Sequence, residues 1–172
     1  MRFLGTCYRA HDPRWAFKPA SGEGAAIRGA RFNPKGMPAL YLGLSIMTAI
    51  KEVSQGFPHR LDPTVLCSYD VDCDDIIDLT TEQGRGAAAI ADEEMGCAWA
   101  TALADGGRPV SWSIHDQLIR RGVAGIVVPS YAPGADPDDR NLVLWDWGPV
   151  LPHKVEVFDP SGRLPRDQLS WG

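Results

Sequence analysis

Three side chains in the first third of the chain have types that can act together on a charged substrate. The turn-rich stretch 28–33 carries two guanidinium groups, the second being Arg31, and a guanidinium can hold a phosphate through paired N–H donors. Tyr41 follows in an apolar segment, and Glu52 places a carboxylate in the next segment. Together these types favour a site that binds an anion and stabilises a positive charge. Each also fits an ordinary role as a solvated charge or a core aromatic.

Several kinds of site are excluded by motifs that the sequence lacks. There is no GxxxxGK[ST] phosphate loop, no GxGxxG, no GxSxG nucleophile elbow and no HExxH zinc helix. The four cysteines show no CxxC spacing and the four histidines are scattered. The acidic run 70–75 lacks the EF-hand spacing and its final glutamate. We therefore expect a site that works without a metal.

The elements that must position these residues are interleaved irregularly. Strands are expected where apolar or alternating runs are bounded by turn residues, over 2–8, 39–44, 64–72, 76–79, 123–129, 141–145 and 154–158. Helices are expected over 46–55, from Thr80 or Thr81 toward Ala91, and over 92–103 and 111–121. Residues 11–38 are expected to form a long, packed loop, with room for one short helical turn. Because regular βαβ units are missing, the pattern predicts an α+β fold with a mixed β-sheet core and flanking helices.

The helix expected over residues 46–55 determines where Glu52 points. Ser45 is its predicted N-cap, and Gly56-Phe57-Pro58 is its predicted end. At about 100° per residue, four apolar residues share the face expected to pack on the core: Ile46, Ala49, Ile50 and Val53. Glu52 lies on the shoulder of that face, next to a strand end, where a carboxylate can face a cleft.

Length and charge limit what the protein can be. Its 172 residues, 44% of them apolar, are enough for one domain spanning 1–172. No segment approaches the roughly 20 apolar residues of a membrane span, and no signal-peptide pattern is present, so we expect a cytoplasmic protein without membrane attachment. The net charge of −5 argues against direct nucleic-acid binding. Residues 1–60 nevertheless hold nine Lys/Arg against three Asp/Glu, which suits a small polyanion such as a pyrophosphate.

Six short motifs in order resemble the RES domain, the toxin half of many bacterial Xre/RES toxin–antitoxin pairs. They are Tyr8-Arg9, Gly29-Ala30-Arg31-Phe32-Asn33, Leu40-Tyr41-Leu42, Ala49-Ile50-Lys51-Glu52, Pro129-Ser130 and Asn141-Leu142-Val143-Leu144. The resemblance covers about residues 7–147, and the ordered set carries it rather than any single motif. Ala30 replaces a family glycine and Phe32 a family tryptophan. Ala30 restricts the backbone more than glycine does.

The resemblance implies a fold similar to ADP-ribosyltransferases of the diphtheria-toxin type. It also implies an enzyme that consumes NAD⁺ as a substrate by cleaving its nicotinamide–ribose bond. The family is named for an arginine, a glutamate and a serine, which correspond here to Arg31, Glu52 and Ser130. The expected catalytic residues are Glu52, which stabilises the positive ribose, together with Arg31 and Tyr41.

The same resemblance implies which residues bind NAD⁺. Arg31, and Arg9 after it, are expected to hold the pyrophosphate, while Tyr41 stacks on the nicotinamide ring. Ser130 and Asn141 are expected to hydrogen-bond a ribose or the nicotinamide amide. From residue type alone, Arg9 also fits the role of a salt-bridge partner, and Ser130 and Asn141 fit turn residues at strand ends.

Several functions stay open. The favoured one is a toxin that transfers ADP-ribose to a host protein, and the alternative is an NAD⁺ glycohydrolase or phosphorylase with no protein acceptor. Some transferases of this fold class carry Gln or Glu two residues before the catalytic glutamate, where this chain has Ile50. A non-catalytic module that binds a nucleotide or a partner is a second alternative. A ribonuclease is disfavoured, because the chain is acidic and lacks a convincing catalytic cluster of His, Lys or Arg.

The expected partner follows from the resemblance alone. It is a cognate Xre-like antitoxin that covers the active site and forms a hetero-oligomer with the toxin. Exposed tryptophans contribute to many interfaces, and the candidates are Trp112, Trp145, Trp147 and Trp171.

Overall fold

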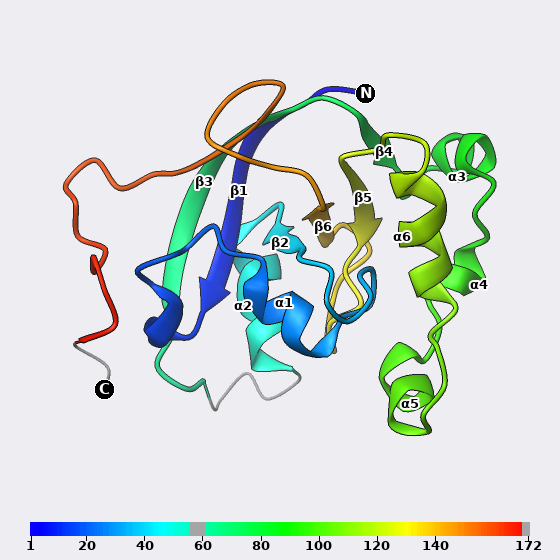
Figure 1. The fold of residues 1–172 in the computed structure, drawn as a ribbon, viewed down its shortest axis with the longest axis horizontal. Helices are drawn as coiled ribbons and strands as arrows, with labels where there is room; N and C mark the ends of the chain where they lie inside the picture. The colour runs from blue at the N-terminus through cyan, green and yellow to red at the C-terminus, as the bar shows by residue number, and fades with distance from the viewer. Residues whose placement is uncertain (56–60, 170–172) are drawn as a thin grey trace.

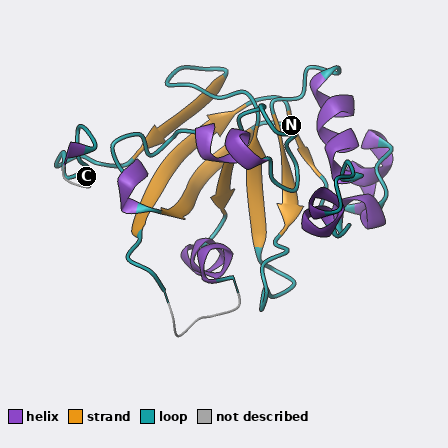
Figure 2. Ribbon diagram, turned by 60° about the horizontal axis from the view of Figure 1, so that its bottom comes forward, coloured by secondary structure: helices purple, strands orange, loops and turns teal. Residues whose placement is uncertain are grey.

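The chain folds around one seven-stranded β-sheet (Figures 1 and 2). The computed structural model describes residues 1–55 and 61–169. The strands are β1 (Phe3–His11), β2 (Leu40–Gly43), β3 (Val65–Cys73), β4 (Ile76–Asp78), β5 (Gly125–Pro129), β6 (Arg140–Leu144) and β7 (His153–Val157). Their order across the sheet is β4-β5-β6-β2-β1-β3-β7. The pairs are antiparallel except β4 with β5, which is parallel.

The helices after residue 45 lie near the positions that the sequence predicts, and two short helices lie within residues 11–38, where a long loop was expected. The helices are the 3₁₀ helix η1 (Pro13–Trp15) and the α-helices α1 (Glu23–Arg28), α2 (Ile46–Ser54), α3 (Glu82–Ala88), α4 (Asp92–Met95), α5 (Trp99–Ala104) and α6 (Ser111–Ile119). The α+β class with a mixed sheet and flanking helices is therefore confirmed. Among the residues described, no helix is long and apolar enough to cross a membrane.

The parallel pair explains why helices α3 to α6 come together at one end of the sheet (Figure 1). Parallel neighbours cannot be joined by a tight turn, so the chain needs a long crossover from β4 to β5. Ile126 and Val128 of β5 point to the face that the crossover covers, where they pack with Ile114 and Leu118 of α6. The intervening Val127 points to the other face, as strand alternation requires.

The same alternation sorts the residues of the two central strands. Leu40 and Leu42 of β2 belong to the core cluster on one face of the sheet, together with Leu142 of β6. Tyr41 therefore points to the opposite face, against the second core cluster that contains Val143. Because the side-chain period of a strand is two, Asn141 lies on the same face as Val143.

Helix α2 packs through a face that is rotated from the predicted one and shares Ala49 with it. Ser45 caps it as expected, accepting from the Thr48 N–H at 3.0 Å. Ile46 and Val53 were expected to be buried, but they are 46% and 36% exposed. The buried residues of the helix are Thr48, Ala49 and Ser54. The predicted end at Gly56-Phe57-Pro58 lies outside the described residues.

Small and polar residues face the sheet because α2 lies very close to β2. A Cβ on Gly43 would lie only 2.8 Å from the Ala49 nitrogen and 3.1 Å from the Ser45 oxygen. A bulky residue such as Ile46 does not fit on that side. Amphipathic spacing predicts a helix correctly but assumes that its larger apolar residues face the core. That assumption is wrong for α2.

Candidate functional site

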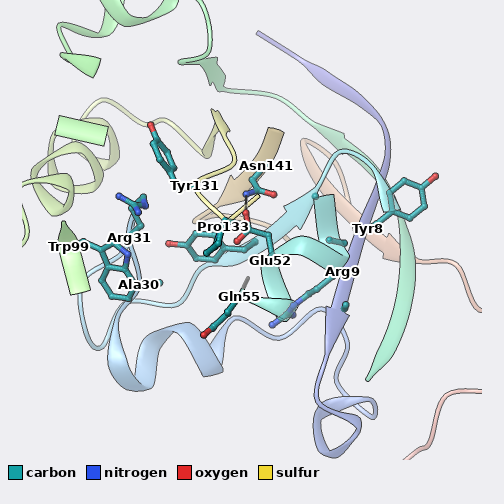
Figure 3. Close-up of a pocket in the computed structure, with 15 residues that line it drawn as sticks. Tyr8, Arg9, Ala30, Arg31, Glu52, Gln55, Trp99, Tyr131, Pro133 and Asn141 are labelled. Atoms are coloured by element: carbon teal, nitrogen blue, oxygen red, sulfur yellow. Dashed lines mark hydrogen bonds between the residues drawn. The ribbon is translucent and has the colours of Figure 1, made fainter. Parts of the chain in front are cut away.

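A cavity of about 320 Å³ lies beside α2, where β1, β2 and β6 meet (Figure 3). Five of the six residues predicted for the site line it: Arg9, Arg31, Tyr41, Glu52 and Asn141. The sixth, Ser130, contacts Glu52 directly. The structure thus brings together groups that are far apart in the sequence.

Sheet register explains why the residues meet. Gly43, at the end of β2, pairs with Tyr8 of β1 on one side and with Asn141 of β6 on the other. Arg9 follows Tyr8, so the cavity has one wall from β1 and another from β6. Helix α2 begins directly after β2 and carries Glu52 two turns along, over the same strands. In Figure 3, Glu52 lies between Arg31 on one side and Arg9 on the other.

The half-buried Glu52 carboxylate is held through a single oxygen. The Ser130 hydroxyl donates to Oε1 at 2.6 Å, and the Asn141 side-chain amide donates to the same atom at 2.5 Å. Within residues 1–55 and 61–169, no donor reaches Oε2. The carboxylate is therefore fixed in orientation while one oxygen stays available for a ligand.

Asn141 carries an unused acceptor at the same place. It is only 7% exposed, and its Nδ2 is engaged with Glu52. Its Oδ1 is buried and meets no hydrogen-bond donor in the part of the chain that the structure describes. Leaving a buried acceptor unpaired costs about 1–3 kcal/mol, so holding Glu52 in this way has an energetic cost.

Arg31 occupies one wall and is held by the protein itself. Its Nη1 donates to the carbonyls of Met95 at 3.1 Å and Cys97 at 2.7 Å, and its guanidinium carbon lies 4.3 Å from the centre of the Tyr131 ring. Burial lowers the pKa of Arg31 from its usual value, although nearby polar groups oppose the shift. The guanidinium still has N–H groups for an anion, because these contacts use only Nη1.

The same contact explains a prediction that was wrong. A single helix was expected over 92–103, but the chain forms α4 and α5 with a break at Gly96 and Cys97. The Met95 and Cys97 carbonyls at this break accept from Arg31. The interruption provides two hydrogen-bond acceptors for the Arg31 guanidinium, and it also places Trp99 on the wall of the cavity.

Two tryptophans hold the loop that carries Arg31. The Trp112 indole donates to the Ala30 carbonyl at 2.7 Å, and the Trp145 indole donates to the Phe32 carbonyl at 2.9 Å. Both were candidates for an exposed interface, but they are only 6% and 8% exposed. Trp147 is partly buried, and Trp171 lies outside the described residues. The two buried indoles therefore support the site from within.

Tyr41 contributes a ring to the cavity and uses its hydroxyl elsewhere. The hydroxyl accepts from the Phe32 backbone N–H at 3.0 Å and donates to Asn33 Oδ1 at 2.9 Å. Burial raises the pKa of Tyr41 well above its usual value, so the phenol stays protonated. The ring can stack on a ligand, while the hydroxyl braces the loop that carries Arg31.

Arg9 adds a second partly buried cation. Its Nη1 donates to the carbonyls of Pro19 at 3.0 Å and Ser21 at 2.9 Å, and burial lowers its pKa from the usual value. Neither Arg9 nor Arg31 forms a salt bridge with any carboxylate of the described chain. Glu52 is the one carboxylate among the residues that line the cavity. Two uncompensated cations against one anion favour an anionic ligand.

Sequence reasoning missed two aromatic residues of the cavity, Tyr131 and Trp99. Tyr131 directly follows Ser130 and supports Arg31 from the other side, so its position next to a family motif was an available signal. Trp99 had no such signal, because its placement depends on the break between α4 and α5.

Metal ligands are not gathered at this cavity. In the described parts of the chain, no group of three or more His, Cys, Asp or Glu residues has an arrangement that could hold a metal ion.

Comparison with known proteins adds two findings. The family model of the RES domain matches residues 6–167. A solved structure, the crystal structure of the M. tuberculosis MbcT-MbcA toxin-antitoxin complex, is similar with a TM-score of 0.61 and 21% sequence identity. The similarity covers 92% of this chain and 84% of that chain, and at this identity it shows a shared fold. No curated protein gives a match.

Proposed function

The chain belongs to the RES-domain family, and from that membership we propose that it is a toxin that consumes NAD⁺. One observation carries the proposal most directly. Glu52 is held by Ser130 and Asn141 through one oxygen, and its other oxygen is left for a ligand in a cavity lined by two unpaired arginines. This is the arrangement needed to bind a dinucleotide and to stabilise positive charge on its ribose.

The cavity has complementary groups for each part of NAD⁺. Arg9 and Arg31 supply positive charge for the pyrophosphate, which guanidinium groups bind through paired N–H donors. The rings of Tyr41, Tyr131 and Trp99 offer apolar walls for a flat heterocycle. A volume of about 320 Å³ lies in the range of roughly 300–1,000 Å³ typical of small-molecule sites.

The proposed reaction breaks the bond between the nicotinamide nitrogen and ribose C1′. The bonding electron pair moves to nicotinamide, whose ring nitrogen loses its positive charge, so this leaving group needs no general acid. Positive charge develops on the ribose, as it does in glycoside cleavage. The Glu52 carboxylate stabilises that charge from a fixed position, and a nucleophile then bonds to C1′.

For the nucleophile, we propose a side chain of a host protein, which receives the ADP-ribosyl group. The second candidate is water or inorganic phosphate, which gives hydrolysis or phosphorolysis of NAD⁺. One observation favours this second candidate. Among the described residues that line the cavity there is no histidine and no carboxylate besides Glu52, and inorganic phosphate, which is already an anion, needs no base to become a nucleophile.

We further propose that the chain works in the cytoplasm with a cognate antitoxin that covers this cavity. The similar solved structure is a toxin–antitoxin complex, which supports the idea of such a partner. The expected result is that expression of the chain alone slows growth of a bacterial host, and that co-expression with the antitoxin encoded beside it restores growth.

The decisive experiment follows free nicotinamide from NAD⁺ with purified wild type, Glu52→Gln and a matched control, Glu156→Gln. Glu156 lies on the edge strand β7, it does not line the cavity, and its side chain is 64% exposed. Reactions run with and without inorganic phosphate and with host lysate. We expect release by wild type and Glu156→Gln, and a loss of at least about a hundredfold in Glu52→Gln.

The fate of the ADP-ribose names the nucleophile. Label on a protein band indicates transfer, free ADP-ribose indicates hydrolysis, and a phosphorylated ADP-ribose that needs added phosphate indicates phosphorolysis. Tight NAD⁺ binding by a folded wild type that releases no nicotinamide under any condition would favour the non-catalytic module instead.

A further inference from the structure

Asp139 lies just before β6 and joins the helix of Glu52 to the strands that face it. Its Oδ1 accepts from the Thr48 hydroxyl at 2.6 Å, and its Oδ2 accepts from Lys51 Nζ at 2.6 Å. Its own carbonyl accepts from the Ser130 backbone N–H at 2.8 Å. Asp139 is therefore bonded both to α2 and to the backbone of a residue that donates to Glu52.

The side chain is almost completely used in these contacts. Asp139 is 8% exposed and Thr48 is 1% exposed, so water does not compete strongly for the bonds. Oδ2 also accepts from the Asp136 backbone N–H at 2.7 Å, which closes the loop before β6. The hydrogen bonds from Lys51, followed by those from Thr48 and Asp136, lower the pKa of Asp139 to about 2, which keeps it ionised at any working pH.

The position of this contact matters because α2 has few large side chains facing the sheet. Its buried residues are Thr48, Ala49 and Ser54, so apolar packing holds the helix only weakly in place along its axis. Thr48 and Lys51 stand four residues and one residue before Glu52, on the turn that leads to it. A shift of the helix would move Glu52 away from both of its donors.

We propose that Asp139 is a positioning residue that sets the placement of the Glu52 carboxylate against Ser130 and Asn141. Asp139 acts through α2 on one side and through the chain from Ser130 to Asn141 on the other. It does not line the cavity and takes no part in the chemistry. The proposal rests on the proposed function for its kinetic test and on geometry for its structural test.

The kinetic test uses a matched pair at Thr48, because the direct variant Asp139→Asn places an amide against Lys51 and is liable to misfold. Thr48→Val keeps the shape but removes the hydroxyl that binds Asp139 and also contacts the Ser45 hydroxyl at 2.8 Å, whereas Thr48→Ser keeps that hydroxyl. We expect kcat for nicotinamide release to fall at least about tenfold in Thr48→Val, with KM for NAD⁺ changed less than about threefold. Thr48→Ser should retain most of the wild-type kcat.

A double-variant cycle separates positioning from simple loss of stability. If Asp139 acts through the contact of Glu52 with Asn141, then Thr48→Val costs much less kcat in an Asn141→Ala background than in wild type. If the double variant instead loses kcat by the product of the two single-variant factors, the proposal is overturned. Equal kcat values for Thr48→Val and wild type, measured well below the unfolding temperature of both proteins, would also overturn it.

Crystal structures of Thr48→Val and Thr48→Ser give a readout that needs no activity. We expect Glu52 Oε1 to leave hydrogen-bond distance of Asn141 Nδ2 in Thr48→Val and to stay there in Thr48→Ser. An unmoved Glu52 in Thr48→Val overturns the positioning proposal. If wild type releases no nicotinamide, the proposed function fails, and the two structures still decide the role of Asp139.

Discussion

Asn141 donates to Glu52, and this role depends on a neutral amide. Asn141→Asp keeps the shape but replaces the donor with an oxygen that faces Glu52 Oε1 at the former 2.5 Å contact. Like charges at this distance repel strongly in a partly buried site. We expect nicotinamide release to fall by about a hundredfold or more in Asn141→Asp, and by only about tenfold in Asn141→Ala. The reverse order in a kcat comparison would contradict the role as donor.

The roles of the Tyr41 ring and of its hydroxyl group can be separated by mutation. Tyr41→Phe keeps the ring in the cavity but removes the hydroxyl that joins Phe32 N–H to Asn33 Oδ1. We expect urea unfolding to show a loss of about 1–3 kcal/mol, because two buried partners lose a bond, while KM for NAD⁺ changes little. Tyr41→Ala should lose more stability than Tyr41→Phe, because it also removes the packed ring, and it should raise KM. A large KM increase in Tyr41→Phe would show that the hydroxyl itself binds the ligand.

Side chains of the site could be predicted from motifs, but their contacts could not. The ordered motifs point to Arg31, Glu52 and Ser130, which the structure places close together. No local pattern shows that Arg31 donates to the carbonyls of Met95 and Cys97, since that contact spans 64 and 66 residues of chain. Long-range pairs of this kind depend on the complete fold.

Gly43 allows α2 to lie close to β2, so it controls where the helix begins. A methyl group at this position would meet the backbone nitrogen of Ala49 at 2.8 Å, and backbone atoms cannot move aside as a flexible side chain can. We expect Gly43→Ala to shift α2, to lower stability by about 1–3 kcal/mol and to abolish most nicotinamide release. Unfolding curves and kcat measure the two effects.

The matched control is Gly86→Ala in α3, where an added Cβ meets nothing within 4 Å. Alanine favours a helix by up to about 1 kcal/mol over glycine, so this variant should be as stable as wild type or more stable, with unchanged kcat. If Gly43→Ala behaves in the same way, α2 does not depend on the close approach.

Most elements could be predicted from the sequence, and the exceptions have physical causes. Strand alternation and capping residues depend on neighbours in the chain, so β1 to β7 and the caps at Ser45 and Thr81 lie close to their predicted positions. The face through which α2 packs was predicted wrongly, and one continuous helix was predicted where α4 and α5 are separated by a break. In both places a tertiary contact, with Gly43 and with Arg31 respectively, outweighs the local amphipathic pattern.

Two buried titratable groups make the whole molecule sensitive to acid. Burial, and then the charge of Arg9, lowers the pKa of His11 to about 4, so the unfolded chain takes up this proton first as pH falls below about 6.5. Stability is therefore lost between pH 6.5 and 4. The low pKa of Asp139, about 2, continues the loss as pH falls from about 4 toward 2.

Urea unfolding at a series of pH values checks this prediction. Wild type should lose up to about 1.4 kcal/mol per pH unit from His11 between pH 6.5 and 4, and His11→Leu should flatten that part of the curve. Asp139→Asn, if folded, should flatten the part below pH 4. An identical slope in His11→Leu and wild type above pH 4 would show that His11 titrates normally.

The separation of the site residues along the chain also sets the order in which the protein can become active during its own synthesis. Glu52 waits for Ser130, 78 residues later, and for Asn141, 89 residues later. When α2 has just emerged from the ribosome, the nascent chain still lacks both donors, as well as the strand that closes the cavity. The site can form only after β6 has emerged. Chains that terminate before β6 therefore contain Glu52 without the complete set of hydrogen-bond donors that holds its carboxylate.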